Sequence, residues 1–228
     1  MPRRPRFAPP GYYLHLTQRG NYRQQTFFTD QDRTTFLNLL AHYADLAQVD
    51  ILAYCLMPNH YHLLACGHAE HSIPRFMQGL NGRYSAYLHG RLTRTGRLWQ
   101  TRYYSCLLEY GHLFSALRYV ECNPVRARLV PHAADYPWSS APIHCHRRPA
   151  PPWLDLPTFQ TLADPADWPE ILADNQSRAE CNHLRRATDA ELPLASPTFL
   201  NTLEARFQRT LHASHAGRPA KSSFPTFH

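Results

Sequence analysis

The sequence predicts an α+β domain in which two strand–helix–strand units follow one another and build one antiparallel sheet. Apolar and polar side chains alternate over residues 12–18, as in a strand with one buried face. Apolar residues recur at helical spacing over 30–48 and predict the first helix. Two apolar runs, 49–57 and 60–66, follow and are separated by a Pro-Asn pair, which is typical of a tight hairpin turn.

The second unit repeats this order. A helix is expected over about 73–87, where the apolar residues lie on one face, and Ser72 stands where an N-cap is expected. A fourth strand is expected over about 98–108, and another helical pattern covers 113–120. The βαββαβ order is the split βαβ, ferredoxin-like arrangement, an antiparallel sheet with helices on one face. The later helix, which bears Tyr119, and a helical C-terminal extension are appended to it.

Composition divides the chain into four parts. Residues 1–140 carry the predicted sheet and its helices, which is enough chain for one well-buried domain. Proline and arginine dominate 141–152, which are expected to form a linker. Short helical patterns predict a helical extension over 153–211, and 212–228 are expected to be a disordered basic tail.

The net charge of +7 favours a polyanionic partner such as nucleic acid. Of the 24 lysines and arginines, only Lys221 is a lysine. Arginine suits bidentate recognition of phosphate and guanine better than lysine does, although a GC-rich genome would produce the same bias. The charge therefore supports DNA binding without locating it.

The six cysteines form no C-x-x-C pair and no regular framework, which favours a reducing cytoplasm. The basic N-terminus is followed by Ala8-Pro9-Pro10-Gly11 rather than by an apolar stretch, so a signal peptide is not expected. No apolar run approaches the ~18 residues that a membrane span needs. We therefore expect a cytoplasmic, nucleoid-associated protein without a membrane partner.

The run M-P-N-H-Y-H-L-L at 57–64 is the most informative part of the chain. Because side chains alternate along a strand, His60 and His62 are expected on one face, with Tyr61 and Leu63 on the other. Two adjacent imidazoles on a rigid strand suggest a metal site. The alternative is structural, with one histidine packed and the other hydrogen-bonded.

Two further blocks extend this pattern: L-W-Q-x-R-Y at 98–103 and R-Y-V-E-x-N-P-V-R-A at 118–127. With the first block, they resemble the single-tyrosine HUH transposases, and in particular the branch known as REP-associated tyrosine transposases. The resemblance covers roughly residues 7–140 and includes W-S-S at 138–140. The H-x-H element alone is weakly specific, whereas the ordered set is strongly specific.

The resemblance implies that residues 1–140 are a catalytic domain that cuts and rejoins single-stranded DNA beside palindromic hairpin repeats. Tyr119 would be the nucleophile, leaving a 5′-phosphotyrosine and a free 3′-hydroxyl. His60 and His62 would hold a divalent metal, Mg²⁺ or Mn²⁺, that polarises the scissile phosphate. Since relatives include swapped dimers and monomers, a homodimer remains open.

Asn123 is the candidate third metal ligand. It follows Tyr119 by four residues and so shares its helical face, and related insertion-sequence transposases have an amide ligand at this step. The alternative is that Asn123 caps a new helix with Pro124 at its first position, because a residue before proline disfavours helical geometry. Glu121, two residues from Tyr119, is expected to face away.

Six arginines are candidate DNA contacts. Arg3, Arg4 and Arg6 lie in the proline-stiffened N-terminal arm. Arg19 at the end of the first strand, Arg102 in the L-W-Q-x-R-Y block and Arg126 after the tyrosine helix each match a family motif near the expected site. The arm could equally be a solvated tail, and the other three could form ordinary surface ion pairs.

Three other interpretations remain open. The chain could bind and repress hairpin repeats without turnover. It could be a phosphohydrolase of the histidine-triad type, although this needs a third alternating histidine and position 64 is Leu. The histidines and cysteines of 144–146, expected in a loop, could form a zinc cluster with those of 181–183.

Overall fold

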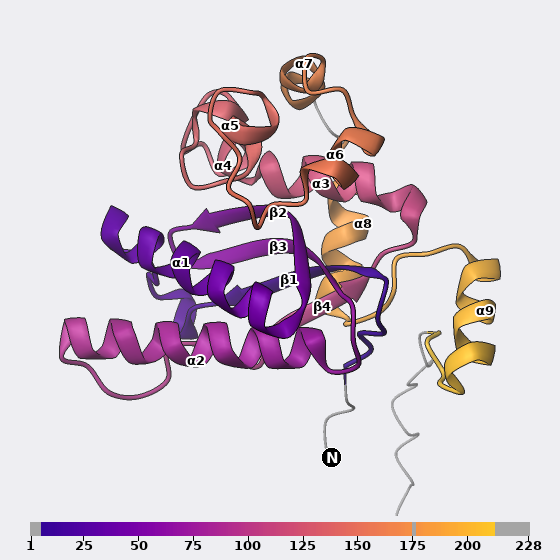
Figure 1. Ribbon diagram of the computed structural model, residues 1–228, viewed down its shortest axis with the longest axis horizontal. Coiled ribbons are helices and arrows are strands. Elements are labelled where there is room, and N and C mark those ends of the chain that lie inside the picture. Colours follow the sequence, from indigo (N-terminus) through magenta and orange to yellow (C-terminus); the bar gives the residue numbers. More distant parts are fainter. Residues whose placement is uncertain (1–5, 175–176, 213–228) are drawn as a thin grey trace, which may run out of the picture.

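The computed structural model describes residues 6–174 and 177–212. Its centre is a four-stranded sheet in the order β2-β3-β1-β4, with every neighbouring pair antiparallel (Figure 1). The strands are β1 (Tyr13–Arg19), β2 (Val49–Met57), β3 (His60–Gly67) and β4 (Tyr104–Leu107). This architecture confirms the predicted fold class. β4 is shorter than expected because Trp99 pairs with Gly20 only in an isolated bridge.

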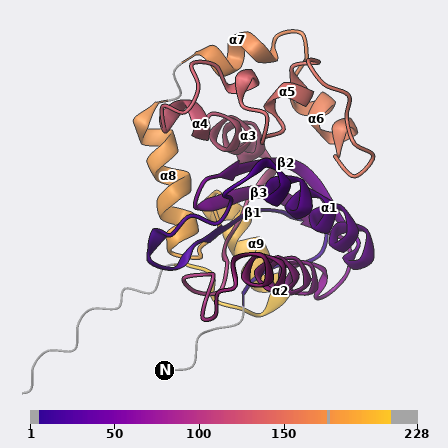
Figure 2. The same ribbon diagram turned by 90° about the vertical axis from the view of Figure 1, so that its left-hand side faces the viewer.

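Helices cover both faces of the sheet (Figures 1 and 2). The first two lie on one face: α1 (Asp30–Ala47) and α2 (Ser72–Leu92). The later ones lie on the other face or beside it: α3 (Leu113–Glu121), α4 (Asn123–Arg126), α5 (Ala141–His144), α6 (Leu156–Leu162), α7 (Trp168–Ala173), α8 (Arg178–Asp189) and α9 (Pro197–Phe207). Helix α8 contacts both α3 and β4, so the extension reaches back to the sheet.

Strand alternation places the two large apolar clusters of the interior on opposite faces of the sheet. Tyr61 and Leu63 of β3 belong to the cluster beneath α1 and α2, together with Phe36 and Phe76. Leu64 belongs to the cluster on the opposite face, which also holds residues of α3, α6, α7 and α8. The sheet and the extension therefore share one apolar core on this face, and apolar burial is the main stabilising contribution to folding.

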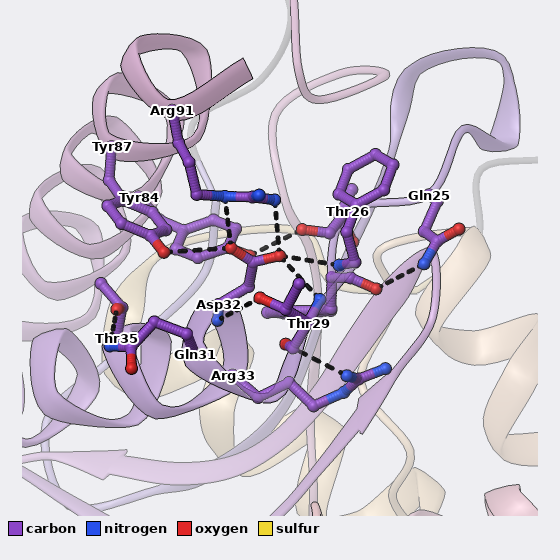
Figure 3. A network of polar contacts seen from close by, with 12 residues as sticks. Gln25, Thr26, Thr29, Gln31, Asp32, Arg33, Thr35, Tyr84, Tyr87 and Arg91 are labelled. Atoms are coloured by element: carbon purple, nitrogen blue, oxygen red, sulfur yellow. Dashed lines mark hydrogen bonds and ion pairs between the residues drawn. The ribbon is translucent and has the colours of Figure 1, made fainter.

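A buried carboxylate joins the start of α1 to the end of α2 (Figure 3). Thr29 caps α1, and the fully buried Asp32 accepts the backbone N–H of Thr29 in return, at 2.9 Å. Asp32 also accepts hydrogen bonds from Arg91 at 2.8 Å and from the Tyr87 hydroxyl at 3.0 Å. Although burial opposes the charge, these backbone and side-chain donors hold the pKa of Asp32 below its usual value.

Two details differ from the sequence predictions, and a third prediction falls almost entirely outside the described residues. Ser72 does not cap α2, because it is the first helical residue and the preceding His71 adopts a left-handed conformation, with φ of 68°. The predicted linker 141–152 begins with α5, whose Ala141 packs in the core. Of the predicted tail 212–228, residues 213–228 lie outside the described part of the chain.

Across residues 6–174 and 177–212, no helix combines the length and the apolar character that crossing a bilayer requires.

Candidate active site

The two histidines of β3 lie on the face that α3 covers. Their ring centroids are 5.0 Å apart. His62 is buried and pairs with Thr17 across the sheet, whereas His60 is half-buried and pairs with Arg19. The alternation read from the sequence therefore places both imidazoles as expected.

Tyr119 approaches these histidines from above the sheet. The apolar face of α3 packs on β2 and β3, which turns the Tyr119 ring toward His62. The two ring centroids are 5.7 Å apart and their planes stand at 88°. The Tyr119 ring makes a similar edge contact with His15 of β1, at 5.7 Å and 83°. Residues far apart in the sequence thus form one aromatic cluster.

This cluster borders a pocket of about 1000 Å³ between the sheet, α4 and α8. Six of the predicted site residues line it: Arg19, His60, His62, Tyr119, Asn123 and Arg126. The other lining residues are His15, Thr17, Arg23, Asn59, Cys181, Asn182, Arg185, Thr188 and Asp189. Arginines outnumber the single aspartate in this lining, so the pocket is suited to a phosphate-bearing ligand.

Asn123 both caps a helix and faces the pocket. Its amide nitrogen donates to the carbonyl oxygens of Tyr119, at 3.0 Å, and of Val120, at 3.2 Å. Helix α3 ends at this point and α4 begins, as the following proline predicted. No described residue donates to Oδ1 of Asn123. The expected role of Asn123 as the N-cap of the next helix is wrong, because Cys122 is that N-cap and Asn123 is the first residue of α4. The Asn123 nitrogen instead bonds the last carbonyls of α3, which leaves its oxygen available to a ligand.

Arg126 holds Tyr119 in two ways. Its guanidinium donates to the Tyr119 carbonyl oxygen and lies 4.4 Å from the centroid of the Tyr119 ring. Burial raises the pKa of Tyr119, and the positive charge of Arg126 partly offsets that increase. The tyrosine of the resting protein is therefore protonated, with a cation beside it.

Both imidazoles of β3 are neutral. Burial, reinforced by Arg19, lowers the pKa of His60 to about 4. Burial, followed by the electrostatic influence of the neighbouring His60 and His15 rings, lowers the pKa of His62 well below its usual value. Metal ligation requires an unprotonated imidazole nitrogen, and both side chains meet that requirement.

The possible metal ligands at the pocket suit a divalent cation whose remaining coordination positions are filled by substrate and water. Two imidazoles and the Asn123 amide oxygen border the pocket, and imidazole and carbonyl donors suit Mn²⁺ and Mg²⁺ respectively. Within the described residues, no group of three or more His, Cys, Asp or Glu side chains could hold a metal. This includes 144–146 and 181–183, so the structure does not support a zinc cluster there.

The remaining predicted arginines lie elsewhere. The side chain of Arg6 is almost fully buried, pairs with Glu191 at 3.0 Å and stacks on Tyr103, which fastens this residue to the domain. Arg102 is exposed and does not line the pocket. Arg3 and Arg4 lie outside the described residues.

Glu121 faces away from the pocket, as expected. Its fully buried carboxylate accepts hydrogen bonds from Ser140 at 2.5 Å, from His144 at 2.6 Å and from the indole of Trp168 at 2.7 Å. His144 is the last residue of α5 and is fully buried, so its expected place in a loop is wrong. The network ties the tyrosine helix to α5 and α7.

The sequence interpretation missed His15 and the residues that α8 contributes. His15 lies two residues from both Tyr13 and Thr17 along β1, so the three side chains share one face of the sheet. This spacing could have predicted the face on which His15 lies. No comparable signal existed for Thr188 and Arg185, because their approach depends on where α8 packs.

The chain belongs to the family described as IS200-like transposases, whose model matches residues 10–123. That span contains the strands, both histidines and Tyr119. The protein is therefore a transposase. No curated protein matches the chain.

Two solved structures are similar to it. One is a REP-associated tyrosine transposase bound to a REP hairpin, with a TM-score of 0.56 and 16% sequence identity, covering 66% of this chain and 89% of that one. The other is a candidate transposase from Deinococcus radiodurans R1, with a TM-score of 0.36 and 23% identity, covering 54% of this chain and 92% of that one. The first similarity shows that the fold is shared.

Proposed function

We propose that the protein is a metal-dependent, single-tyrosine nuclease and strand transferase that cuts and rejoins single-stranded DNA beside palindromic hairpins. The observation that carries this proposal is the edge contact of Tyr119 with His62, in a pocket where two neutral imidazoles meet several arginines. The hairpin substrate is supported by the similar transposase whose structure contains a REP hairpin.

In the proposed reaction, the phenolic oxygen of Tyr119 attacks the phosphorus of a DNA phosphodiester. A bond forms between this oxygen and phosphorus, and the bond from phosphorus to the 3′-oxygen breaks. Tyr119 loses one proton and the departing 3′-oxygen gains one, so no net proton is released. One phosphodiester replaces another. Rejoining by a 3′-hydroxyl therefore needs no nucleotide cofactor.

His60, His62 and the amide oxygen of Asn123 would hold the metal, Mg²⁺ or Mn²⁺, at the edge of the pocket. When bound, the metal would neutralise charge on the phosphate oxygens. The protein itself orients the nucleophile, since Arg126 fixes the Tyr119 backbone and covers its ring. Arg19 and Arg126, both exposed at the pocket, would contact DNA phosphates.

Both the predicted catalytic domain and the C-terminal extension contribute residues to the pocket. Residues 1–140 contribute the nucleophile and the proposed metal ligands, and the extension 153–211 contributes one wall through α8. We propose that the extension shapes the substrate site rather than forming an independent module.

The test is a cleavage assay with end-labelled single-stranded hairpins from the genomic flanks, in Mn²⁺ or in EDTA. We expect a metal-dependent covalent protein–DNA band with the wild type and none with Tyr119→Phe. Tyr43→Phe is the matched control and should retain the band, because Tyr43 is half-buried between α1 and α2, on the other face of the sheet. Cleavage that survives Tyr119→Phe would mean that water is the nucleophile.

A non-catalytic hairpin-binding protein is the second candidate. It is favoured by the burial of Tyr119, which is only 7% exposed and has a raised pKa. Tight hairpin binding without a covalent band in any metal would support this function.

A mixing experiment addresses whether two copies of the protein act together as a homodimer. Tyr119→Phe and His62→Ala, each inactive alone, would together restore cleavage if Tyr119 of one copy serves the histidines of another. Continued inactivity would show that each copy uses its own tyrosine.

A further inference from the structure

His15 is a fully buried polar residue to which the proposed reaction assigns no part. It lies in the middle of β1, 1% exposed, and both of its ring nitrogens make hydrogen bonds. One partner is His62, and the other is Thr188 of α8. A buried histidine that links a candidate metal ligand to a separate helix requires a physical explanation.

The hydrogen bond between Thr188 and Leu184 determines which group donates in the two hydrogen bonds of His15. The Thr188 hydroxyl donates its only proton to the carbonyl oxygen of Leu184, one helical turn earlier, at 2.9 Å. In its second hydrogen bond, to Nδ1 of His15 at 2.8 Å, the hydroxyl oxygen must therefore accept. Nδ1 of His15 is the protonated nitrogen.

The His15 ring is 1% exposed and neither of its nitrogens bonds to a carboxylate, so the buried ring is neutral and carries one proton. Since that proton is on Nδ1, Nε2 of His15 can only accept. Its partner at 2.9 Å, Nδ1 of His62, must therefore donate. His62 is also neutral, so its remaining nitrogen, Nε2, carries a free lone pair.

His60 reaches the same state by a separate route. The amide nitrogen of Asn59 donates to the carbonyl oxygen of Arg23 at 3.1 Å, which fixes the orientation of the amide. The amide oxygen of Asn59 then accepts from Nδ1 of His60 at 2.7 Å. Both histidines of β3 are thus protonated on Nδ1 and unprotonated on Nε2.

We propose that Leu184, Thr188, His15 and His62 form a hydrogen-bond relay that fixes the tautomer and orientation of His62, so that its Nε2 presents a lone pair to a divalent cation. His15 and Thr188 are positioning residues, and α8 of the extension becomes part of the metal site. This inference rests on the proposed metal-dependent function. The relay also holds the two rings within 6° of parallel, against the edge of Tyr119.

The geometry specifies what happens when Thr188 is removed. Without an acceptor at position 188, Nδ1–H of His15 is buried and unpaired, which is unfavourable. The His15 proton then moves to Nε2, and Nδ1 of His62 must accept instead of donating. Nε2 of His62 becomes protonated and loses its lone pair. Loss of such outer hydrogen bonds typically weakens metal affinity by about 10- to 100-fold.

The first measurement is a long-range ¹H–¹⁵N correlation spectrum of the full-length, metal-free protein labelled on histidine. We expect His62 protonated on Nδ1 in the wild type and increasingly on Nε2 in Thr188→Val, a substitution of nearly equal shape. Thr188→Ser retains the hydroxyl and should restore the wild-type spectrum. Thr202→Val is the matched control, because the Thr202 hydroxyl makes the same bond to the carbonyl oxygen four residues earlier on exposed α9.

The second measurement is the Kd of Mn²⁺ by calorimetry for the same proteins. We expect Thr188→Val to bind about 10- to 100-fold more weakly, and Thr188→Ser and Thr202→Val to bind as the wild type does. A wild-type His62 protonated on Nε2, or an unchanged Kd in Thr188→Val, would overturn the relay.

These measurements separate the relay from the proposed function. Mn²⁺ binding that is weakened by Thr188→Val, in a protein that forms no covalent DNA band, would support the relay and contradict the transferase reaction. A wild-type protein that binds no Mn²⁺ would contradict the proposed metal site. It would also contradict the proposed role of the relay, which is to present His62 to that metal.

Discussion

The Tyr119 ring stands edge-on to the His62 ring, with centroids 5.7 Å apart and planes at 88°. This contact joins the helix on top of the sheet to the central strand β3. Residues that hold either ring, such as Asn123 beneath the end of α3, therefore influence the position of both.

Asn123 allows its two roles to be separated. Asn123→Asp keeps an oxygen donor but loses the N–H groups that cap α3, whereas Asn123→Ala loses both. We expect both variants to lose about 1 kcal/mol of stability, and only Asn123→Ala to bind Mn²⁺ more weakly. Urea denaturation and calorimetry measure the two effects. Wild-type Mn²⁺ affinity in Asn123→Ala would remove Asn123 from the ligand set.

Arg19 is expected to contact a DNA phosphate. Arg19→Ala should weaken hairpin binding and reduce the slope of log K against log salt by about 0.7, the value for one phosphate on a single strand. The control is Arg75→Ala, an exposed arginine of α2 on the other face of the sheet. Filter binding across a salt series measures both slopes. Equal slopes for Arg19→Ala and the wild type would place the DNA elsewhere.

Asp32→Asn should destabilise the domain by about 1–3 kcal/mol at pH 7, because it weakens the contacts with Arg91 and with the start of α1. Since the pKa of Asp32 is lowered on folding, its stabilisation is present above the unfolded value of 3.8 and is lost as the pH falls through the folded value. The difference between variant and wild type should therefore shrink in acid. Chemical denaturation at several pH values tests this.

The control for that series is Asp30→Asn, since Asp30 is exposed and forms an ion pair with Arg33 at 3.5 Å. It should change stability by less than about 0.5 kcal/mol. A constant difference for Asp32→Asn across the pH range would show that its charge does not stabilise the fold.

Glu121→Ala should be among the most damaging substitutions in the chain. It leaves Ser140, His144 and Trp168 without their buried acceptor, and we expect a loss of about 3–5 kcal/mol. Thermal denaturation measures the loss, with the exposed Glu170→Ala of α7 as the control. An effect no larger than that control would mean that the network does not hold α3 in place.

Much of the fold was predictable because it depends on local periodicity. The alternation around His60 and His62 placed both side chains on one face, and the Asn-Pro step at 123–124 predicted where the tyrosine helix would end. The Ser72 cap was wrong because the left-handed His71 precedes the helix and Ser72 is already its first residue. The loop around His144 was wrong because a buried contact with the distant Glu121 holds His144 in the core.

The sequence by itself determined the order of strands and helices, the face of β3 that carries the histidines, and the spacing of Tyr119 and Asn123. Only the tertiary structure decided that His15 lies against His62, because this contact requires β1 to pair with β3. Only packing likewise decided that Thr188, 173 residues from His15, completes the hydrogen-bonded chain. Backbone geometry imposes periodicity over a few residues, whereas contacts between distant segments arise only when apolar faces are buried together.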